Sequence, residues 1–146
     1  LTTRVVLAGR TSLPLIIQSQ EAGDDILEIL YTYANGLTII LHCFSLFSHV
    51  DACSQRGYYM SIAGNVTFAK ATGLRKAVAR IPDDLLLTET DSPYLTPVPH
   101  RGQPNTPANV RYVLEELAHL RGANPDELTN QIDYNFTSAF SPKSRN

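Results

Sequence analysis

Four nearly continuous apolar stretches alternate with helical patterns along this chain, and that rhythm restricts the folds open to it. The stretches are LPLIIQS (13–19), LTIILHCFS (37–45), GYYMSIAGNV (57–66) and LLLTETD (85–91). The first, second and fourth do not alternate between apolar and polar residues, as is typical of strands covered on both faces in a parallel sheet. The third stretch contains two tyrosines and two glycines, so it is compatible with a half-exposed strand as well as with a buried one.

Helical patterns, marked by apolar side chains at three-to-four spacing, fill the intervals. They cover residues 21–34, 48–57 (short and weak), 69–81, 106–122 and a last segment from Asn124. In the fourth pattern Thr106 can cap the helix, Pro107 suits its first turn and Gly122 ends it. Strands that alternate with helices in this way predict βα units, and hence a parallel α/β sheet in a single domain, residues 1–146.

The composition excludes several classes of protein. With 43% hydrophobic and 18% charged residues, the 146-residue chain is an ordinary globular domain. Its net charge of −2 does not indicate a basic surface that binds nucleic acid. It does not exclude such binding, because a site that uses metal ions carries their positive charge. Cys43 and Cys53 form no C-x-x-C pair, so we expect two reduced thiols in a cytoplasmic protein. No apolar run reaches the roughly 18 residues of a membrane span, and LTTRVVLAGR lacks a signal peptide's cleavage pattern.

Two of the predicted strand ends carry residues that bind metal ions or move protons. In parallel α/β sheets functional groups collect just past the carboxyl ends of the strands. The second strand ends near His42, and the fourth ends in Glu89 and Asp91. Because side chains alternate along a strand, Glu89 and Asp91 are expected on one face, where the two carboxylates repel unless a cation or an arginine lies near them. Cys43 is expected on the opposite face from His42, so a Cys-His nucleophilic pair is not expected.

Each of these residues also has a simpler interpretation. His42 can be a hydrogen-bonded histidine with no ligand, Asp91 can cap the following Ser-Pro turn, and Glu89 can pair with an arginine. Their position together at strand ends favours a shared site. His100 and Arg101, in the loop after the fourth strand, are either contacts for an anionic substrate or plain exposed loop residues.

Six segments, taken together, show a family resemblance. They are LPLIIQSQEA, ILHCFS, YYMSIAGNVTF, LLLTETDSPYLTPVPHRGQPN, PANVRYVLEELAHLRG and NFTSAF. In order and spacing they resemble the TatD family of metal-dependent deoxyribonucleases, over roughly Leu7 to Phe140. The resemblance implies a TIM barrel that hydrolyses phosphodiester bonds of DNA with a divalent cation (Mg, Mn or Zn).

The resemblance also implies roles for individual residues. His42 matches the second of the family's two later histidine ligands, and Asp91 matches the aspartate of its last strand. Glu89 belongs to the same motif and would line the barrel interior beside Asp91. Asp91, with Glu89, is thus the candidate catalytic group, and Asp91 would also orient or deprotonate the water that attacks the phosphodiester. His100 and Arg101 are the candidates for substrate binding.

The chain departs from the family pattern in its first strand. Where the family reads IIHSR, Gln18 replaces a ligand histidine and Gln20 replaces a basic residue. The family's His-x-His and Glu-Ile-Gly-Leu-type strands have no counterpart, so we expect a partial barrel, the last four strands of eight with their helices. Barrels of this type usually need about 250 residues. The start on Leu1 rather than Met suggests an absent upstream segment.

A half barrel leaves two open, apolar edges, here residues 13–19 and 85–91. Exposed edges invite pairing with another chain. We therefore expect a homodimer that closes the sheet, association with the missing barrel half, or a poorly soluble fragment.

Two other functions remain open. Because ligands are missing or replaced, the chain can be a degenerate, non-catalytic module that binds a partner or nucleic acid. A small doubly wound α/β domain that binds a nucleotide ranks last, since no glycine-rich phosphate loop follows the first strand.

Overall fold

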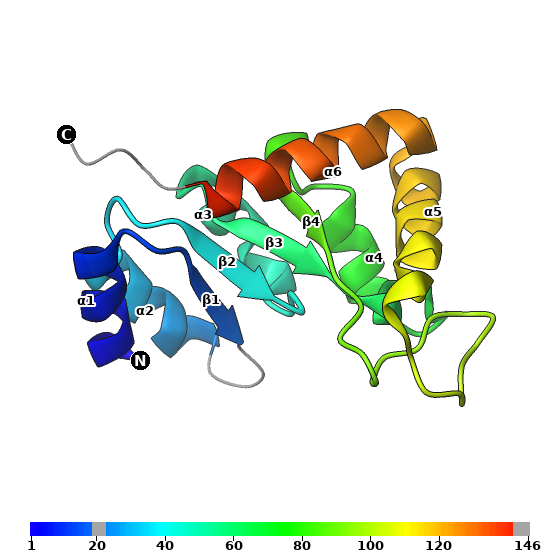
Figure 1. Ribbon diagram of the computed structural model, residues 1–146, viewed down its shortest axis with the longest axis horizontal. Helices are drawn as coiled ribbons and strands as arrows, with labels where there is room; N and C mark the ends of the chain where they lie inside the picture. The colour runs from blue at the N-terminus through cyan, green and yellow to red at the C-terminus, as the bar shows by residue number, and fades with distance from the viewer. Residues whose placement is uncertain (19–22, 142–146) are drawn as a thin grey trace.

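The computed structural model describes residues 1–18 and 23–141, which form one parallel sheet with helices on both of its faces (Figure 1). The strands are β1 (Leu15–Gln18), β2 (Ile39–His42), β3 (Tyr59–Ile62) and β4 (Leu86–Thr88). The helices are α1 (Thr2–Thr11), α2 (Gly23–Tyr33), α3 (Val50–Gln55), α4 (Thr72–Val78), α5 (Val110–Arg121) and α6 (Pro125–Phe140). Short 3-10 turns are η1 (Phe47–His49), η2 (Gly64–Thr67), η3 (Asp83–Leu85) and η4 (Pro107–Asn109).

The sheet has the order β1-β2-β3-β4, and every neighbouring pair is parallel. All four predicted strands are confirmed in order, and β1 and β4 are the edges, as expected. The register places Gln18 opposite His42 and Ser61 opposite Leu87. Since all strands point the same way, their carboxyl ends lie along one side of the sheet.

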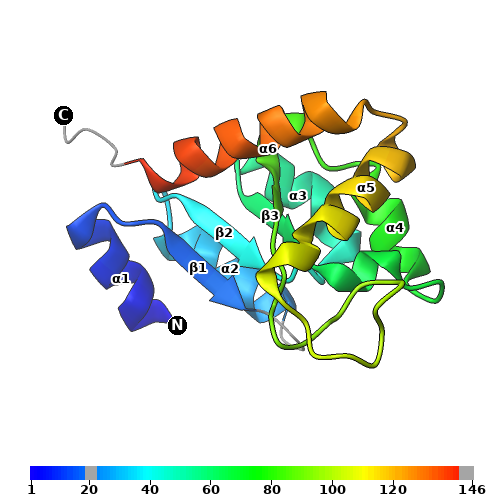
Figure 2. The ribbon, with the colours of Figure 1, turned by 45° about the vertical axis from the view of Figure 1, so that its right-hand side comes forward.

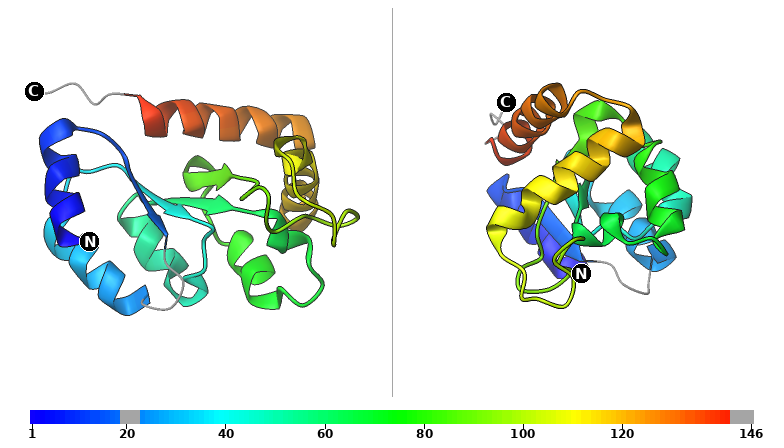
Figure 3. Two further views of the ribbon diagram at one scale, coloured as in Figure 1. Left: turned by 60° about the horizontal axis from the view of Figure 1, so that its bottom comes forward. Right: turned by 90° about the vertical axis from the view of Figure 1, so that its right-hand side faces the viewer.

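The helices cover the two faces of the sheet differently. In the left view of Figure 3, α2 to α4 lie on one side of the sheet, α1 lies beside its β1 edge, and α6 crosses the other side. The main core lies under α1 to α4 and includes fully buried Val5, Leu30, Met60 and Leu86. On the other face, which we call the inner face, Ala139 of α6 packs with Ile40 and Leu87. Figure 2 shows α5 and α6 joined at an angle at the β4 end of the sheet.

Helix α1 is the one α-helix among the described residues that sequence patterns do not predict. Its sequence, TTRVVLAGRT, contains three threonines and two valines, which are poor helix formers. Only Val5 and Ala8 are buried, and the helix packs against α2. Tertiary packing of a narrow face therefore stabilises a helix that local propensity does not favour.

Two helix ends agree with the sequence, which places a helix end at Gly122 and a helix start at Asn124. Gly122 ends α5 in the left-handed conformation, at φ 60°. The side chain of Asn124 accepts hydrogen bonds from the backbone N–H groups of Asp126 and Glu127 at the start of α6. The expectation for Thr106 is wrong: it precedes η4 and its side chain makes no capping bond, because α5 begins only at Val110.

The loop after β4, residues 91–106, is held firmly against its neighbours. The Asn105 side chain is buried and donates to the backbone oxygens of Thr90 and Tyr94, both at 2.8 Å. A Cβ atom on Gly64 would lie 2.0 Å from the backbone oxygen of Leu95, so only glycine lets η2 and the loop approach so closely. The structure thus fixes this loop over the carboxyl end of β3.

As for membranes, none of the helices in residues 1–18 and 23–141 has both the length and the apolar character needed to cross a bilayer.

Candidate metal centre

Three side chains meet at the carboxyl ends of β2 and β4. His42 is the last residue of β2, Glu89 follows β4 directly, and Asp91 lies two residues further on. His42 Nε2 lies 3.1 Å from Glu89 Oε1 and 3.6 Å from Asp91 Oδ1. One ligand atom from each residue falls within 4.8 Å of the other two, close enough to share a metal ion. The structure therefore brings together the three residues that the sequence singled out at the strand ends.

The backbone places the two carboxylates in a way that strand alternation does not describe. The predicted strand 85–91 is too long, since β4 ends at Thr88. The N–H of Glu89 still donates to the Ile62 oxygen, at 3.0 Å, which keeps Glu89 in line with the sheet. Asp91, however, has a φ of 56°, and its oxygen accepts from the Tyr94 N–H at 2.8 Å. A left-handed turn, rather than alternation, brings Asp91 back beside Glu89.

Glu89 is the most enclosed member of the group. Its side chain is 14% exposed, against 30% for His42 and 28% for Asp91. Oε2 accepts the backbone N–H of Cys43 at 3.1 Å, which fixes the carboxylate against β2. Oε1 is buried and, in spite of its short distance to His42 Nε2, has no hydrogen-bond partner among the described residues. A buried carboxylate oxygen without a hydrogen bond is costly unless a cation neutralises it.

The Cys43 thiol is not a ligand of this group. Burial, and then the charges of Glu89 and Asp91, raise its pKa to about 11. A thiol binds metal as the thiolate, and two neighbouring carboxylates oppose its formation.

Gln18 lies beside the group, opposite His42 in the sheet register. Together with Arg4 and His42 it lines an open cleft of about 470 Å³ next to β1. An amide oxygen here is a weaker ligand than the histidine of the family pattern. Gln20 lies outside the described residues.

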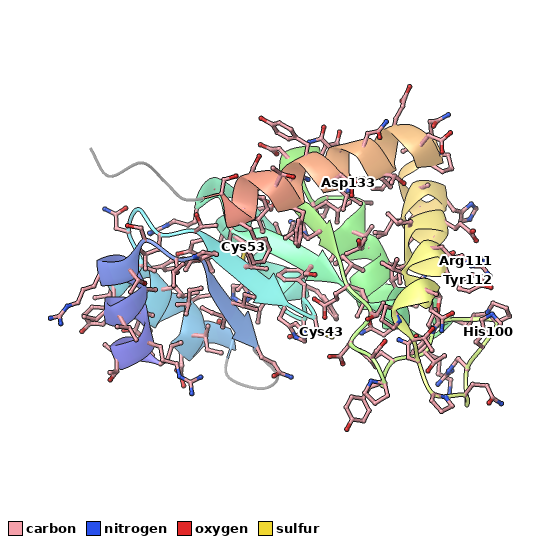
Figure 4. The ribbon with its side chains drawn as sticks, in the orientation of Figure 1. Cys43, Cys53, His100, Arg111, Tyr112 and Asp133 are labelled. Atoms are coloured by element: carbon pink, nitrogen blue, oxygen red, sulfur yellow. The ribbon has the colours of Figure 1, made fainter. Side chains whose placement is uncertain are left out.

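His100 and Arg101 do not join the metal group; they form contacts on the loop that follows it. The His100 ring stacks edge-on against Tyr112, with Nε2 2.8 Å from the tyrosine hydroxyl. Arg101 places its guanidinium carbon 4.0 Å from the centroid of the Phe68 ring. Figure 4 shows His100, Tyr112 and Arg111 gathered where the loop meets α5, and Cys43 at the end of β2. Tyr112 and Arg111 were not predicted as site residues. They lie in α5, for which the sequence predicted only the buried apolar positions.

Comparison with known proteins decides the family. The sequence profile described as "TatD related DNase" matches residues 1–141. The chain belongs to the TatD family. An uncharacterized metal-dependent hydrolase, TatD, of Mycobacterium tuberculosis is 42% identical over 123 residues, which are 84% of this chain and 47% of that protein. YcfH of Escherichia coli, also named an uncharacterized metal-dependent hydrolase, is 42% identical over 132 residues. The match covers 87% of this chain and 49% of YcfH.

Solved structures give the same family fold. YjjV, a TatD homologue from Escherichia coli, superposes with a TM-score of 0.86 at 29% identity, over 94% of this chain and 53% of that one. A TatD family hydrolase from Entamoeba histolytica gives 0.84 at 18% identity, over 97% and 55%, which shows the fold alone. The chain spans about half the length of the curated relatives it matches. Its parallel four-stranded sheet is thus part of a TIM barrel, which confirms the predicted partial barrel.

Proposed function

We propose that this chain carries part of the metal centre of a TatD-type hydrolase that cleaves phosphodiester bonds of DNA. The observation that carries the proposal is the convergence of His42, Glu89 and Asp91 at the carboxyl end of the sheet, with Glu89 Oε1 buried and without a hydrogen bond from residues 1–18 or 23–141. The curated relatives named above are called metal-dependent hydrolases. The DNA substrate rests on the family description.

The residues fit a divalent cation. One imidazole nitrogen and two carboxylate oxygens form a donor set that suits Mn²⁺ or Zn²⁺, and three protein ligands are the usual number at a catalytic zinc site. Two negative charges balance a divalent ion. A cation there would also relieve the repulsion between the carboxylates.

The proposed chemistry divides the work among these residues. A bound divalent cation supplies Lewis-acid activation of water and of a phosphoryl oxygen. Glu89, held by the Cys43 N–H, is a ligand of fixed position. Asp91, more exposed and set on a turn, is the group that orients the attacking water and accepts its proton. His100 and Arg101 contact the anionic substrate.

A calorimetric titration of the purified chain with Mn²⁺ and with Zn²⁺ tests the proposal. We expect micromolar binding that is lost in Asp91→Ala and kept in Asp133→Ala, a matched control on the exposed side of α6. A folded wild-type chain that binds neither ion would refute the site. Cleavage of labelled DNA with Mn²⁺, and its loss with EDTA, then tests the substrate.

A second function is favoured by Gln18, which stands where the family has a histidine ligand. In this alternative the chain binds nucleic acid or a protein partner without hydrolysis. The His42→Ala variant distinguishes the two functions. A hydrolase cleaves DNA as wild type and loses that cleavage in the variant. A binding module cleaves DNA neither as wild type nor as the variant, and the variant keeps its affinity for DNA.

The cysteines support a proposal about compartment. Cys43 and Cys53 are both free thiols in the structure. We propose a reducing, cytoplasmic environment, since an oxidising one selects for disulfides. Immunodetection after cell fractionation tests this, and recovery with secreted proteins would contradict it.

A further inference from the structure

A second cleft lies at the amino ends of β2 and β3, at the end of the sheet opposite the metal centre. It holds about 310 Å³ and is bordered by the loops before these two strands, residues 34–38 and 56–59, and by Ser138 of α6. In Figure 1 the carboxyl-terminal end of α6 lies close to the starts of both strands. We propose that this cleft binds a small oxyanion, a phosphate or a carboxylate group, through Arg56. The inference does not depend on the proposed hydrolase function.

The polar groups that line the cleft suit an anion. Among the described residues that line it, Arg56 is the one cation, and none is an aspartate or a glutamate. The hydroxyl and amide groups of Thr38, Ser138 and Asn35 supply neutral hydrogen-bond donors. Small-molecule sites usually have volumes of about 300 Å³ or more, so a cleft of this size takes a small ligand.

Arg56 has a supported position and donors that no carboxylate uses. Its guanidinium carbon lies 4.2 Å from the centroid of the Tyr31 ring, and Tyr31 packs against the main core. Stacking occupies the face of the guanidinium and leaves the N–H donors in its plane available. Within residues 1–18 and 23–141 no carboxylate forms an ion pair with Arg56. The guanidinium can therefore bind the two oxygens of an oxyanion in a bidentate manner.

A short turn between α3 and β3 holds the backbone of Arg56 at the border of the cleft. The Arg56 N–H donates to the backbone oxygen of buried Cys53 at 3.2 Å, where α3 ends. Gly57 follows with a φ of 68°, which favours glycine, and the Tyr58 N–H donates to the same Cys53 oxygen at 3.0 Å. These bonds fix the backbone of Arg56 before a ligand binds, which lowers the entropy cost of binding.

A ¹⁵N NMR titration of the metal-free chain tests the site. Metal ions are removed on a chelating resin, and inorganic phosphate or malonate replaces chloride at constant ionic strength. We expect at least one of the two anions to bind with a Kd of about 1 mM or lower. The largest changes in chemical shift should fall in residues 34–38 and 56–59. Binding of phosphate alone assigns the site to phosphate groups, and binding of malonate alone assigns it to carboxylates.

Three arginine variants test the role of the guanidinium. Arg56→Gln removes the charge and should weaken binding at least about tenfold, because charge-assisted hydrogen bonds are stronger than neutral ones. Arg56→Lys keeps the charge without the planar donors and should give an intermediate affinity. Arg111→Gln is the matched control and should bind as wild type does: Arg111 is also exposed and stacks on a tyrosine, Tyr112, but it lies on α5.

A steric variant tests whether the anion enters the cleft. Ser138→Leu adds apolar volume to the wall formed by α6 and leaves Arg56 intact, so binding should weaken. Thr137→Leu, at the exposed neighbouring position, should have no effect. Thermal melts show whether each variant folds. Equal affinity of wild type and Arg56→Gln, or no binding of either anion by wild type, overturns the site. Wild-type affinity in Ser138→Leu overturns it as well, since the anion would then bind an exposed arginine outside the cleft.

Discussion

His42 Nε2 lies 3.1 Å from Glu89 Oε1, and this contact joins the end of β2 to the residue after β4, across the intervening strand β3. The contact gives Oε1 no hydrogen bond from any described residue, and in the proposed metal centre both atoms would be ligands. This contact is part of the metal centre that we propose, and each of its residues can be tested separately.

Glu89→Gln keeps the shape of the side chain and removes its charge. Since the amide oxygen can still accept the Cys43 N–H, the fold should be preserved while affinity for Mn²⁺ falls by at least about tenfold. Calorimetry measures the change. Glu28→Gln, on the exposed side of α2, is the matched control and should bind as wild type does. An unchanged affinity in Glu89→Gln would remove Glu89 from the centre.

Gln18→His restores an imidazole opposite His42. Imidazole is a stronger ligand than an amide for Mn²⁺ and Zn²⁺, so we expect affinity for either ion to rise at least about tenfold. Ile16→His is the control, because Ile16 shares the inner face with Gln18 but lies two residues further from the strand end. If both histidine variants bind as wild type does, β1 takes no part in the centre.

The sequence is sufficient for much of the fold because its signals are local. Long apolar runs, the Gly122 stop and the Asn124 cap each determine an element from a few neighbouring residues. Helix α1 is not predictable in this way, since its stabilisation comes from burial of Val5 and Ala8 against residues far along the chain. Strand lengths are overestimated for a related reason: apolar runs continue past the strands into buried loops, as at Phe44 after β2. After β4, the polar residues Glu89 to Asp91 were also counted in the strand.

For the site, the residue types were predictable and the geometry was not. His42, Glu89 and Asp91 stand out because ionisable groups follow apolar runs. Their convergence depends on the left-handed backbone conformation of Asp91; the sequence indicated a turn before Ser92-Pro93 but not this conformation. Arg111 and Tyr112 escaped prediction because only the folded loop brings His100 to them.

Asn135 is a structural residue whose loss should destabilise the fold. It is buried in α6, and its side-chain nitrogen donates to the backbone oxygens of Asp83, at 2.7 Å, and Leu86, at 2.9 Å. Asn135→Ala leaves both oxygens without that donor, so we expect the free energy of unfolding to fall by about 2–4 kcal/mol. Urea unfolding measures it, with exposed Asn130→Ala on the same helix as control. A loss equal to that of the control would show that these bonds contribute little.

Because the Cys53 thiol is buried, we expect the free energy of unfolding to fall at alkaline pH. Burial raises the pKa of its thiol from 9.0 to about 11, so the unfolded chain releases this proton first as pH rises. The contribution to stability is complete below about pH 9 and is lost between pH 9 and 11, on the order of 2 kcal/mol. Burial also raises the pKa of Cys43, Tyr58 and Tyr59, so the difference between wild type and Cys53→Ala isolates Cys53.

Urea unfolding of both proteins at pH 8 and at about pH 10.5 tests this. Cys53→Ala should be less stable at pH 8 and lose less on going to the higher pH. Parallel losses in the two proteins would mean that the Cys53 thiol does not titrate differently in the folded and unfolded states.

The open edges of the sheet lead to a prediction about association. Ile16, on edge strand β1, is 54% exposed, and Val6 and Leu7 on the neighbouring helix α1 are also exposed. Within the described residues β4 pairs only with β3, so the opposite edge is open as well. We propose that a second copy covers both edges, because two four-stranded sheets related by a two-fold axis supply the eight parallel strands of a closed barrel.

Light scattering coupled to size exclusion tests the proposed association. The chain has a mass of 16.1 kDa, and we expect the solution mass of a dimer. Ile16→Lys places a charge on the inner face at the edge, where it opposes strand pairing, and should shift the mass toward one chain. Tyr33→Lys changes an equally exposed apolar residue on α2 and should leave the dimer intact. A soluble wild-type monomer would contradict the proposal, because it would show that the edges tolerate water without a partner.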